Sequence, residues 1–233
     1  MLSFIIPTLN EEKHIERLLE QLKPQLHKED EIIIVDSHSK DRTVEIAKSF
    51  GAKVITRPKE GIGLAKTAGA KEATQEILVF MDADCVPSGD FAARIRGHFR
   101  DPEIIAIGGM GLYKSDSRVR EFTYNTFAKL VFHTANVTHK VTGKYWFAAN
   151  NCAFRKSVFI GVGGYRSVVC EDTDLTRRLP ASKNVKYDGK LRLYLSDRRF
   201  KEDGFLQTIW LWGTSNIAAT IGRGKSTQGY RKD

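Results

Sequence analysis

Short apolar runs alternate with helix-like segments through the first half of the chain. The apolar runs cover residues 2–6, 31–35, 53–56 and 77–81, and they have the length of strands. Between them, apolar residues recur at helical spacing over 11–26, a polar turn at 36–43 leads into a helix ending at Phe50, and a further helix covers 61–74. This alternation predicts an α/β fold with a Rossmann-like, mostly parallel central sheet flanked by helices.

The second half continues with longer segments. A strand is predicted over 104–112 and another over 191–199, where a turn carries Arg198 and Arg199. Residues 118–140 are predicted to form a helix whose apolar residues face the core. Residues 205–221 are predicted to form a C-terminal amphipathic helix, packed on the domain or lying on a membrane beside basic residues.

The strand at 77–81 ends abruptly in two carboxylates, Asp82 and Asp84. The carboxyl ends of parallel strands are where open α/β sheets bind ligands, and carboxylate oxygens there suit Mg²⁺ or Mn²⁺. An isolated Asp-x-Asp more often only ends a strand and caps the next segment, so the residues around it must distinguish this interpretation from a metal site. Asp36 and the loop at residues 7–11 follow other predicted strands and should line the same edge.

Other candidates near this edge have ordinary structural interpretations as well. Asn10 is predicted to be a helix N-cap. The Gly61 and Gly63 pair matches no phosphate-binding loop and can relieve a tight turn, whereas Lys66 is a candidate anion contact.

Composition and charge narrow the class of protein. The chain has 233 residues, 41% hydrophobic and 28% charged, which fits one globular domain. A net charge of +9 favours an anionic partner: nucleic acid, an acidic membrane surface or a phosphorylated ligand. The sequence shows neither zinc-finger spacing nor an RNA-recognition aromatic signature, so no nucleic acid is expected.

The cysteine spacing and the N-terminal sequence are not typical of an exported protein. Three widely spaced cysteines form neither a disulfide framework nor a zinc motif, which suits a reducing cytosol. The N-terminus resembles a first strand and not a signal peptide, and no segment resembles a membrane span. We expect a cytoplasmic protein, peripheral on the cytoplasmic membrane face if the C-terminal helix binds lipid.

The order of these motifs resembles the family 2 glycosyltransferases of the GT-A fold. The motifs are Pro-Thr-Leu-Asn-Glu at 7–11, Ile-Val-Asp-Ser-x-Ser-x-Asp-x-Thr at 34–43, Gly-x-Gly-x-Ala-Lys-x-x-Gly at 61–69 and Met-Asp-Ala-Asp at 81–84. The family's usual second loop is Asp-Asp-Gly-Ser, whereas this chain has His38 in place of the glycine. The resemblance implies one domain over 1–233, with a nucleotide-sugar half at 1–112, an acceptor half at 113–204, and a helix and basic tail at 205–233.

The resemblance also implies roles for individual residues. Asp84 would bind Mg²⁺ or Mn²⁺ with Asp82 nearby, and the nucleotide sugar would contact Pro7, Leu9, Glu11, Asp36, Lys66, Asp82, Ala83, Arg198 and Arg199. The segment 143–155 resembles the family's acceptor segment, with alanine where glycine is common. The acceptor would contact Trp146, Asn150, Asn151 and Glu171. In the Glu-Asp-x-Asp-Leu segment at 171–175, Asp172 would be the general base that deprotonates the acceptor.

The expected function is metal-dependent, inverting transfer of a sugar from a UDP- or GDP-sugar to a glycan hydroxyl or a lipid phosphate. The processive pattern Gln-x-x-Arg-Trp is absent, since Gln207 precedes Thr-Ile-Trp-Leu, so single transfer is expected. Two alternatives stay open: a nucleotidyltransferase of similar fold, and a non-enzymatic basic binding module.

Overall fold

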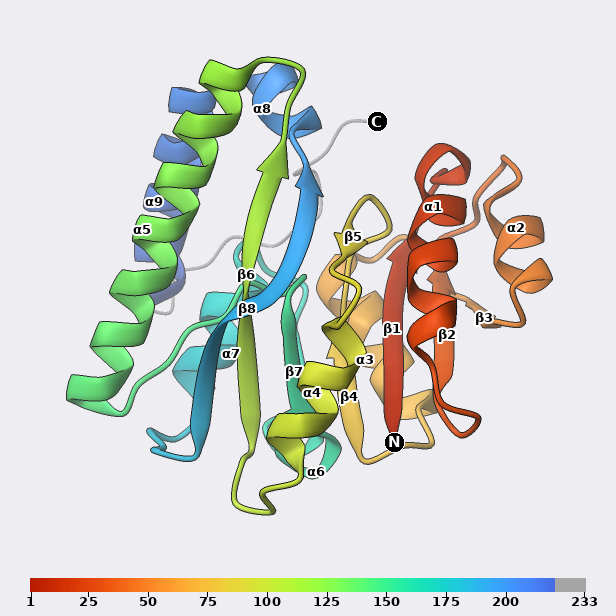
Figure 1. Cartoon of the computed structure of the whole chain (residues 1–233), viewed down its shortest axis with the longest axis horizontal. Coiled ribbons are helices and arrows are strands. Elements are labelled where there is room, and N and C mark those ends of the chain that lie inside the picture. The colour runs from red at the N-terminus through yellow and green to blue at the C-terminus, as the bar shows by residue number, and fades with distance from the viewer. Residues whose placement is uncertain (221–233) are drawn as a thin grey trace.

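A computed structural model describes residues 1–220, with side chains to residue 216 (Figure 1). Its strands are β1 (Leu2–Thr8), β2 (Glu31–Asp36), β3 (Lys53–Thr56), β4 (Ile77–Phe80), β5 (Val86–Pro87), β6 (Ala106–Lys114), β7 (Cys152–Arg155) and β8 (Val185–Ser196). Its helices are α1 (Glu12–Leu22), the 3₁₀ turn η1 (Lys23–Gln25), α2 (Thr43–Ser49), α3 (Ile62–Glu72), α4 (Phe91–Phe99), α5 (Arg118–Thr142), α6 (Lys156–Gly161), α7 (Glu171–Arg178), α8 (Arg198–Asp203) and α9 (Phe205–Thr220).

One mixed sheet runs through these strands in the order β3-β2-β1-β4-β7-β6-β8-β5. The first four are parallel neighbours, as are β6 and β8, whereas β4 with β7, β7 with β6, and β8 with β5 pair antiparallel. The predicted α/β class with a sheet flanked by helices is therefore confirmed. The antiparallel pairs of the second half were not predicted, because strand pairing over long separations leaves no mark in local periodicity.

Both faces of the sheet are buried, which explains the continuous apolar runs. Successive residues of a strand point to opposite faces, so Phe4 and Ile6 join one apolar cluster while Ile5 joins the other. Helices α1 and α4 cover the first face, and α3, α6 and α7 contribute to the second.

Helix α3 packs unusually close to the sheet because Gly69 has no side chain. A β-carbon at Gly69 would fall 2.6 Å from Ile5 Cγ2 and 2.8 Å from Val35 Cγ2, so the helix could not approach this far with alanine there. Lys66 lies one helical turn earlier on the same face, and it is 1% exposed. The close approach therefore carries a lysine into the interior.

Two local predictions near the N-terminus are wrong. The first strand does not end at Ile6, because β1 continues through Pro7 to Thr8, which is in register with Asp36 of β2. Pro7 is tolerated because pairing with β4 has already ended at Ile5, so its missing N–H is not needed on that side. Asn10 is not the N-cap of α1: it has a φ of 54°, and the N-cap is Glu11 without a side-chain cap bond.

The prediction that α5 faces the core is also wrong in large part. The helix buries Tyr124, Phe132 and His139, yet Phe122, Leu130 and Val137 are 74%, 64% and 59% exposed. Apolar residues occur on two opposite sides of this helix, and the spacing that predicted one core-facing stripe does not separate them.

The C-terminal elements differ in their bounds from those predicted. The last strand spans Val185–Ser196, and the two arginines expected in a turn begin the short helix α8. The final helix is present over Phe205–Thr220, and it packs through Phe205 on Tyr124 of α5 and on Phe200 of α8. Its expected last residue, Ile221, and the basic tail lie outside the described residues.

Candidate active site

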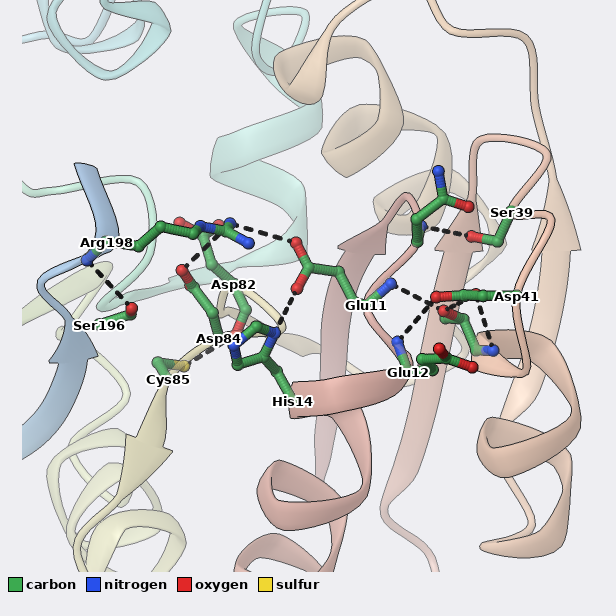
Figure 2. Close-up of polar contacts among 12 residues, drawn as sticks. Glu11, Glu12, His14, Ser39, Asp41, Asp82, Asp84, Cys85, Ser196 and Arg198 are labelled. Atoms are coloured by element: carbon green, nitrogen blue, oxygen red, sulfur yellow. Dashed lines mark hydrogen bonds and ion pairs between the residues drawn. The ribbon is translucent and has the colours of Figure 1, made fainter. Parts of the chain in front are cut away.

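The carboxyl ends of β1, β2 and β4 lie side by side, and polar loops follow all three. Thr8 of β1 and Asp36 of β2 are in register, and Asp82 and Asp84 follow β4. Figure 2 shows Glu11, Asp82, Asp84 and Arg198 pointing toward one another in this region, with Ser39 and Asp41 on its other side. The predicted meeting of these loops at one sheet edge is therefore observed.

Asp36 is buried at this edge and holds its own loop in place. Its carboxylate accepts hydrogen bonds from Thr8 Oγ1 at 3.1 Å and from the backbone N–H of Ser39 at 2.9 Å. The Ser39 hydroxyl also lies 2.5 Å from this carboxylate and accepts from the Asn10 N–H at 2.9 Å. The loops that follow β1 and β2 are thus joined through one buried carboxylate.

The start of α1 is capped by the second loop. Asp41 Oδ2 accepts from the Glu12 N–H at 3.0 Å, and Thr43 Oγ1 accepts from the Glu11 N–H at 2.8 Å. Capping from a neighbouring loop satisfies helix N–H groups that Asn10 was expected to serve. The Asn10 amide oxygen instead accepts from the Lys40 N–H at 2.9 Å.

Three residues with side chains adopt positive φ in the described chain, and each lies in a candidate-site loop. They are Asn10 at 54°, His38 at 63° and Cys170 at 59°. Left-handed backbone is unfavourable for residues that carry a β-carbon, and such strain clusters at functional sites. His38 has the backbone that glycine adopts most easily, which accounts for the glycine in the family's usual loop.

Lys66 is held between the end of β4 and the segment before β7. Its ammonium nitrogen lies 2.8 Å from Asp82 Oδ1 and donates to the Ala149 carbonyl, also at 2.8 Å. Burial alone would lower the pKa of Lys66, but Asp82 and Glu171 raise it above its usual value. The lysine is therefore charged, and its positive charge offsets the negative charges of Asp82 and Glu171.

Asp84 faces a different cation. Arg198 Nη2 lies 3.5 Å from Asp84 Oδ2 and 3.4 Å from Glu11 Oε1, so α8 is tied to the loops that follow β4 and β1 (Figure 2). Glu11 also contacts His14 Nδ1 at 2.9 Å. Burial and then the neighbouring Asp82 raise the pKa of Asp84, and Arg198 opposes the shift. A cation is thus favoured at Asp84.

The donor set suits a divalent ion that shares its ligands with a substrate. Mg²⁺ is typically held by one or two carboxylates, water and substrate phosphates, and not by a cage of protein ligands. Asp84 is 24% exposed at its side chain and Asp82 28%. Within residues 1–220, no group of three or more histidine, cysteine, aspartate or glutamate side chains converges as a complete protein site.

Helix α7 begins with the acidic segment. Cys170 is its N-cap. Glu171, Asp172 and Asp174 lie in its first turn, where the helix dipole stabilises negative charge. Asp172 Oδ1 accepts from the Thr173 N–H at 2.8 Å. Burial and then Glu171 raise the pKa of Asp172 to about 7, and burial also raises that of Glu171. Asp174 is the structural member, paired with Arg178 at 2.8 Å.

The segment at residues 143–155, which resembles the family's acceptor segment, lies against this helix. Trp146 donates from Nε1 to Thr173 Oγ1 at 3.1 Å, next to Asp172. Asn151 is 1% exposed and donates to the Leu191 carbonyl at 3.4 Å, so its side chain belongs to the interior. The amide oxygen of Asn150 is buried and has no hydrogen-bond partner among the described residues. An unpartnered buried acceptor is a reason to expect a ligand.

The remaining predicted residues are spread around this site. Ala83 is buried between the two aspartates, whereas Pro7 and Leu9 are partly exposed at the first loop. Arg199 stacks over Trp212 of α9 with its guanidinium 5.6 Å from the ring centre, and its charge also opposes the raised pKa of Glu171. Arg198 and Arg199 thus point to different parts of the site.

Sequence reasoning missed some residues that the structure brings in. Thr173 bonds both Trp146 and Asn216 of α9, and His14 contacts Glu11. His14 lies three residues after Glu11, and this spacing on a helix was the one available signal. Thr173 and Asn216 are far apart in sequence, so no local pattern joined them.

Comparison with known proteins identifies the family to which this chain belongs. Residues 3–163 match the family model "Glycosyl transferase family 2". An O-antigen chain rhamnosyltransferase of Salmonella typhimurium is 25% identical over 189 residues, covering 76% of this chain and 60% of the relative. A dolichol-phosphate mannosyltransferase of Pyrococcus furiosus is 36% identical over 112 residues, covering 46% and 32%. The chain thus spans less than two thirds of these curated relatives.

Solved structures show the same fold. A mannosyltransferase from Pyrobaculum calidifontis in complex with GDP-Man and Mn²⁺ aligns with a TM-score of 0.67 and 20% identity, covering 98% of this chain and 66% of that one. Glucosyl-3-phosphoglycerate synthase from Mycobacterium tuberculosis, in complex with Mn²⁺, UDP-glucose and phosphoglyceric acid, aligns with a TM-score of 0.62 and 20% identity, covering 96% and 79%. These similarities confirm the GT-A fold, and the family model shows that the chain belongs to the family 2 glycosyltransferases.

Proposed function

We propose that this glycosyltransferase moves a sugar from a nucleoside diphosphate sugar to an acceptor with inversion, one sugar at a time. The observation that carries the proposal is that two pairs of charged residues belong to one site. Asp84 and Arg198 form an ion pair at the carboxyl edge of the sheet. Glu171 and Asp172 lie in the first turn of α7. Lys66 links them, since it contacts Asp82 and its charge acts on Glu171. A leaving-group site and a base site within one charge network are what sugar transfer requires.

A divalent cation, Mg²⁺ or Mn²⁺, would be held by Asp84 with Asp82 nearby. When bound, it would supply charge neutralisation for the leaving diphosphate. Arg198 now contacts Asp84 and Glu11, and its fork of donors suits a phosphate as well as a carboxylate. We propose that the guanidinium turns to the diphosphate when the donor binds.

The donor's nucleoside would lie over Pro7, Leu9, Glu11 and Asp36. The buried Asp36 carboxylate, already bonded to Thr8 and Ser39, would fix the shape of this pocket. Lys66 and Ala83 would shape the floor beneath the diphosphate, since both are buried. Two solved structures of similar fold are complexes with GDP-Man and with UDP-glucose, so we propose a UDP- or GDP-sugar as donor.

The acceptor, a glycan hydroxyl or a lipid phosphate, would bind between Trp146 and Asn150 on one side and α7 on the other. Asp172 would remove its proton during attack on the anomeric carbon, and Glu171 would contact the acceptor beside it. The unpartnered Asn150 amide oxygen can accept a hydrogen bond from a sugar hydroxyl. Asn151 would support this segment from the interior, because its side chain is buried.

A thermal-shift panel tests the donor assignment. The protein is melted with UDP-, GDP- and CDP-sugars, each with Mn²⁺, with Mg²⁺ and with EDTA. A ligand that binds only the native state raises the melting temperature, by about 2.7 kcal/mol of added stability at 100 times its Kd. One nucleotide should stand out, and only with a divalent ion. A panel in which no nucleotide sugar shifts the melting temperature would refute the proposal.

The two alternative interpretations make different predictions in the same panel. A nucleotidyltransferase would respond to nucleoside triphosphates, and a basic binding module would respond to heparin and to no nucleotide. Family membership argues against both, because the matched family transfers sugars.

A further inference from the structure

Helix α5 presents an exposed apolar stripe along its whole length. Val119, Phe122, Leu130, Val137 and Val141 are 75%, 74%, 64%, 59% and 77% exposed. They follow at spacings of 3, 8, 7 and 4 residues, which keep them on one face of a helix with 3.6 residues per turn. The helix packs on the domain by the opposite face, through Tyr124, Phe132 and His139.

The length and composition of this face distinguish it from scattered surface apolar residues. A 25-residue helix is about 37 Å long, and α5 lies along one edge of the molecule in Figure 1, with α9 next to it. Contiguous apolar surface of this extent marks an interaction site in soluble domains. Each helix in residues 1–220 is either too short or too polar to span a bilayer.

Threonine hydroxyls on the exposed side are already satisfied by the helix itself. Thr123, Thr126, Thr134 and Thr142 donate to the carbonyls of Val119, Phe122, Leu130 and Thr138, at 2.9, 2.8, 2.8 and 2.7 Å. Such back-bonding leaves no donor seeking a partner. A protein partner would normally exchange hydrogen bonds across the interface, and this face offers few.

The charge along the stripe is positive. Arg118, Lys129 and Lys140 are exposed and follow at 11-residue intervals, about three helical turns, so they form a row along one edge of the stripe. The one acidic residue of α5, Glu121, accepts from the Ser115 N–H at 3.1 Å and is partly buried. A second copy that packed its own α5 against this face would bring a matching row of cations, so a symmetric α5–α5 contact is disfavoured.

We propose that the outward face of α5 is the surface by which this protein lies on an anionic membrane. An amphipathic helix with an apolar stripe and a row of cations inserts its apolar side chains among the lipid tails and places its cations at the headgroups. This proposal does not depend on the sugar-transfer chemistry, because it concerns only where the protein lies.

The docked orientation would have a consequence for the acceptor side. A pocket of about 460 Å³ beside α5 is lined by residues that include Leu130, Thr134, Tyr145 and Trp146. Leu130 belongs to the exposed stripe, and Trp146 bonds Thr173 next to Asp172. Docking through α5 would therefore bring the opening of this pocket close to the lipid.

Vesicle sedimentation tests the proposal with the full chain. The wild type should bind vesicles of phosphatidylcholine with 30% phosphatidylglycerol, and binding should weaken as salt rises. Phe122→Gln combined with Leu130→Gln should lower the partition coefficient about tenfold or more, because each removes a large apolar side chain from the lipid. Both positions are exposed, so the melting temperature should stay unchanged.

Matched variants separate the proposal from its alternatives. Lys129→Gln with Lys140→Gln should weaken binding, whereas Lys13→Gln with Lys48→Gln, equal in charge and exposed on the other half, should not. Leu206→Gln with Trp210→Gln removes the exposed apolar residues of α9. The proposal is overturned if the wild type ignores anionic vesicles, if only the α9 variant loses binding, or if the α5 variant binds normally. It is also overturned if ultracentrifugation shows a dimer that the α5 variant dissociates.

Discussion

Lys66 Nζ lies 2.8 Å from Asp82 Oδ1, so a fully buried ammonium supports the first aspartate of the Asp-Ala-Asp segment from below. The same nitrogen donates to the Ala149 carbonyl and so connects the end of β4 to the segment at residues 143–155. The position of this lysine depends on Gly69, which lets α3 approach the sheet. A residue expected to contact the donor's anion is thus also a structural link between the two halves of the site.

The Lys66 pair should be visible in stability. Lys66→Met keeps most of the side chain's volume but leaves Asp82 without its cation, and breaking a buried pair costs about 3 kcal/mol. We expect the free energy of unfolding in urea to fall by about that amount. Adding Asp82→Asn should restore part of the loss, since the carboxylate in direct contact with Lys66 is then removed while Glu171 still lacks the nearby cation. Equal destabilisation in the single and double variants would show that the charge pair is not the cause.

His38 should be a strained position that glycine relieves. Its φ of 63° is unfavourable for a residue with a β-carbon by about 1–2 kcal/mol. His38→Gly is therefore expected to raise the free energy of unfolding, by up to about 1 kcal/mol once the greater freedom of the unfolded chain is included. His38→Ala is the control, because it keeps the β-carbon and should give no gain. A gain in the alanine variant would instead assign the effect to the imidazole.

Much of this site was predictable from the sequence because its residues follow strands. Asp36 and Asp84 were placed at one edge by strand continuity alone. The partners of Lys66 and Arg198 were not predictable, since they depend on how closely α3 packs and on where α8 begins. The exposure of Phe122 was also missed, because periodicity shows that a helix has an apolar face and not what covers it.

Asp84 should be required for metal-dependent donor binding. Asp84→Ala removes a partly exposed carboxylate after a strand end, so the fold should persist while Mn²⁺-dependent nucleotide binding is lost. Calorimetry with the nucleotide diphosphate, with and without Mn²⁺, measures this. Glu72→Ala is the control, since it removes an exposed carboxylate whose salt bridge to Lys53 contributes little. Retained Mn²⁺-dependent binding in the Asp84 variant would exclude it as the ligand.

The raised pKa of Asp172 predicts opposite effects of pH on activity and on stability. A base must be ionised, so kcat/KM should fall as pH is lowered through about 7. An acid whose pKa is raised by folding stabilises the protein fully below its unfolded pKa, near 3.8, and this contribution disappears as pH rises through about 7. The melting temperature of the wild type should therefore drop relative to Asp172→Asn between pH 5 and 8. A constant difference between the two proteins over this range would contradict the shift.

The choice between Asp172 and Glu171 separates catalysis from binding. If Asp172 is the base, it acts only as the acceptor oxygen attacks, so Asp172→Asn should lower kcat while donor affinity changes little. General-base catalysis typically contributes about 10²- to 10⁴-fold, and the amide keeps the shape of the side chain without its proton affinity. We expect a loss of that order in turnover, measured under saturating donor.

Glu171→Gln is the matched variant, because the two residues are adjacent and both have raised pKa values. Adjacent residues at a helix start point in different directions, so they cannot face the acceptor equally. Glu171 lies against α3, where a β-carbon at Gly63 would fall 3.3 Å from Glu171 Cβ, and the charge of Lys66 acts on it. Its substitution should therefore change acceptor KM or stability more than kcat. Near-normal turnover in Asp172→Asn with a collapse in Glu171→Gln would transfer the role of base to Glu171.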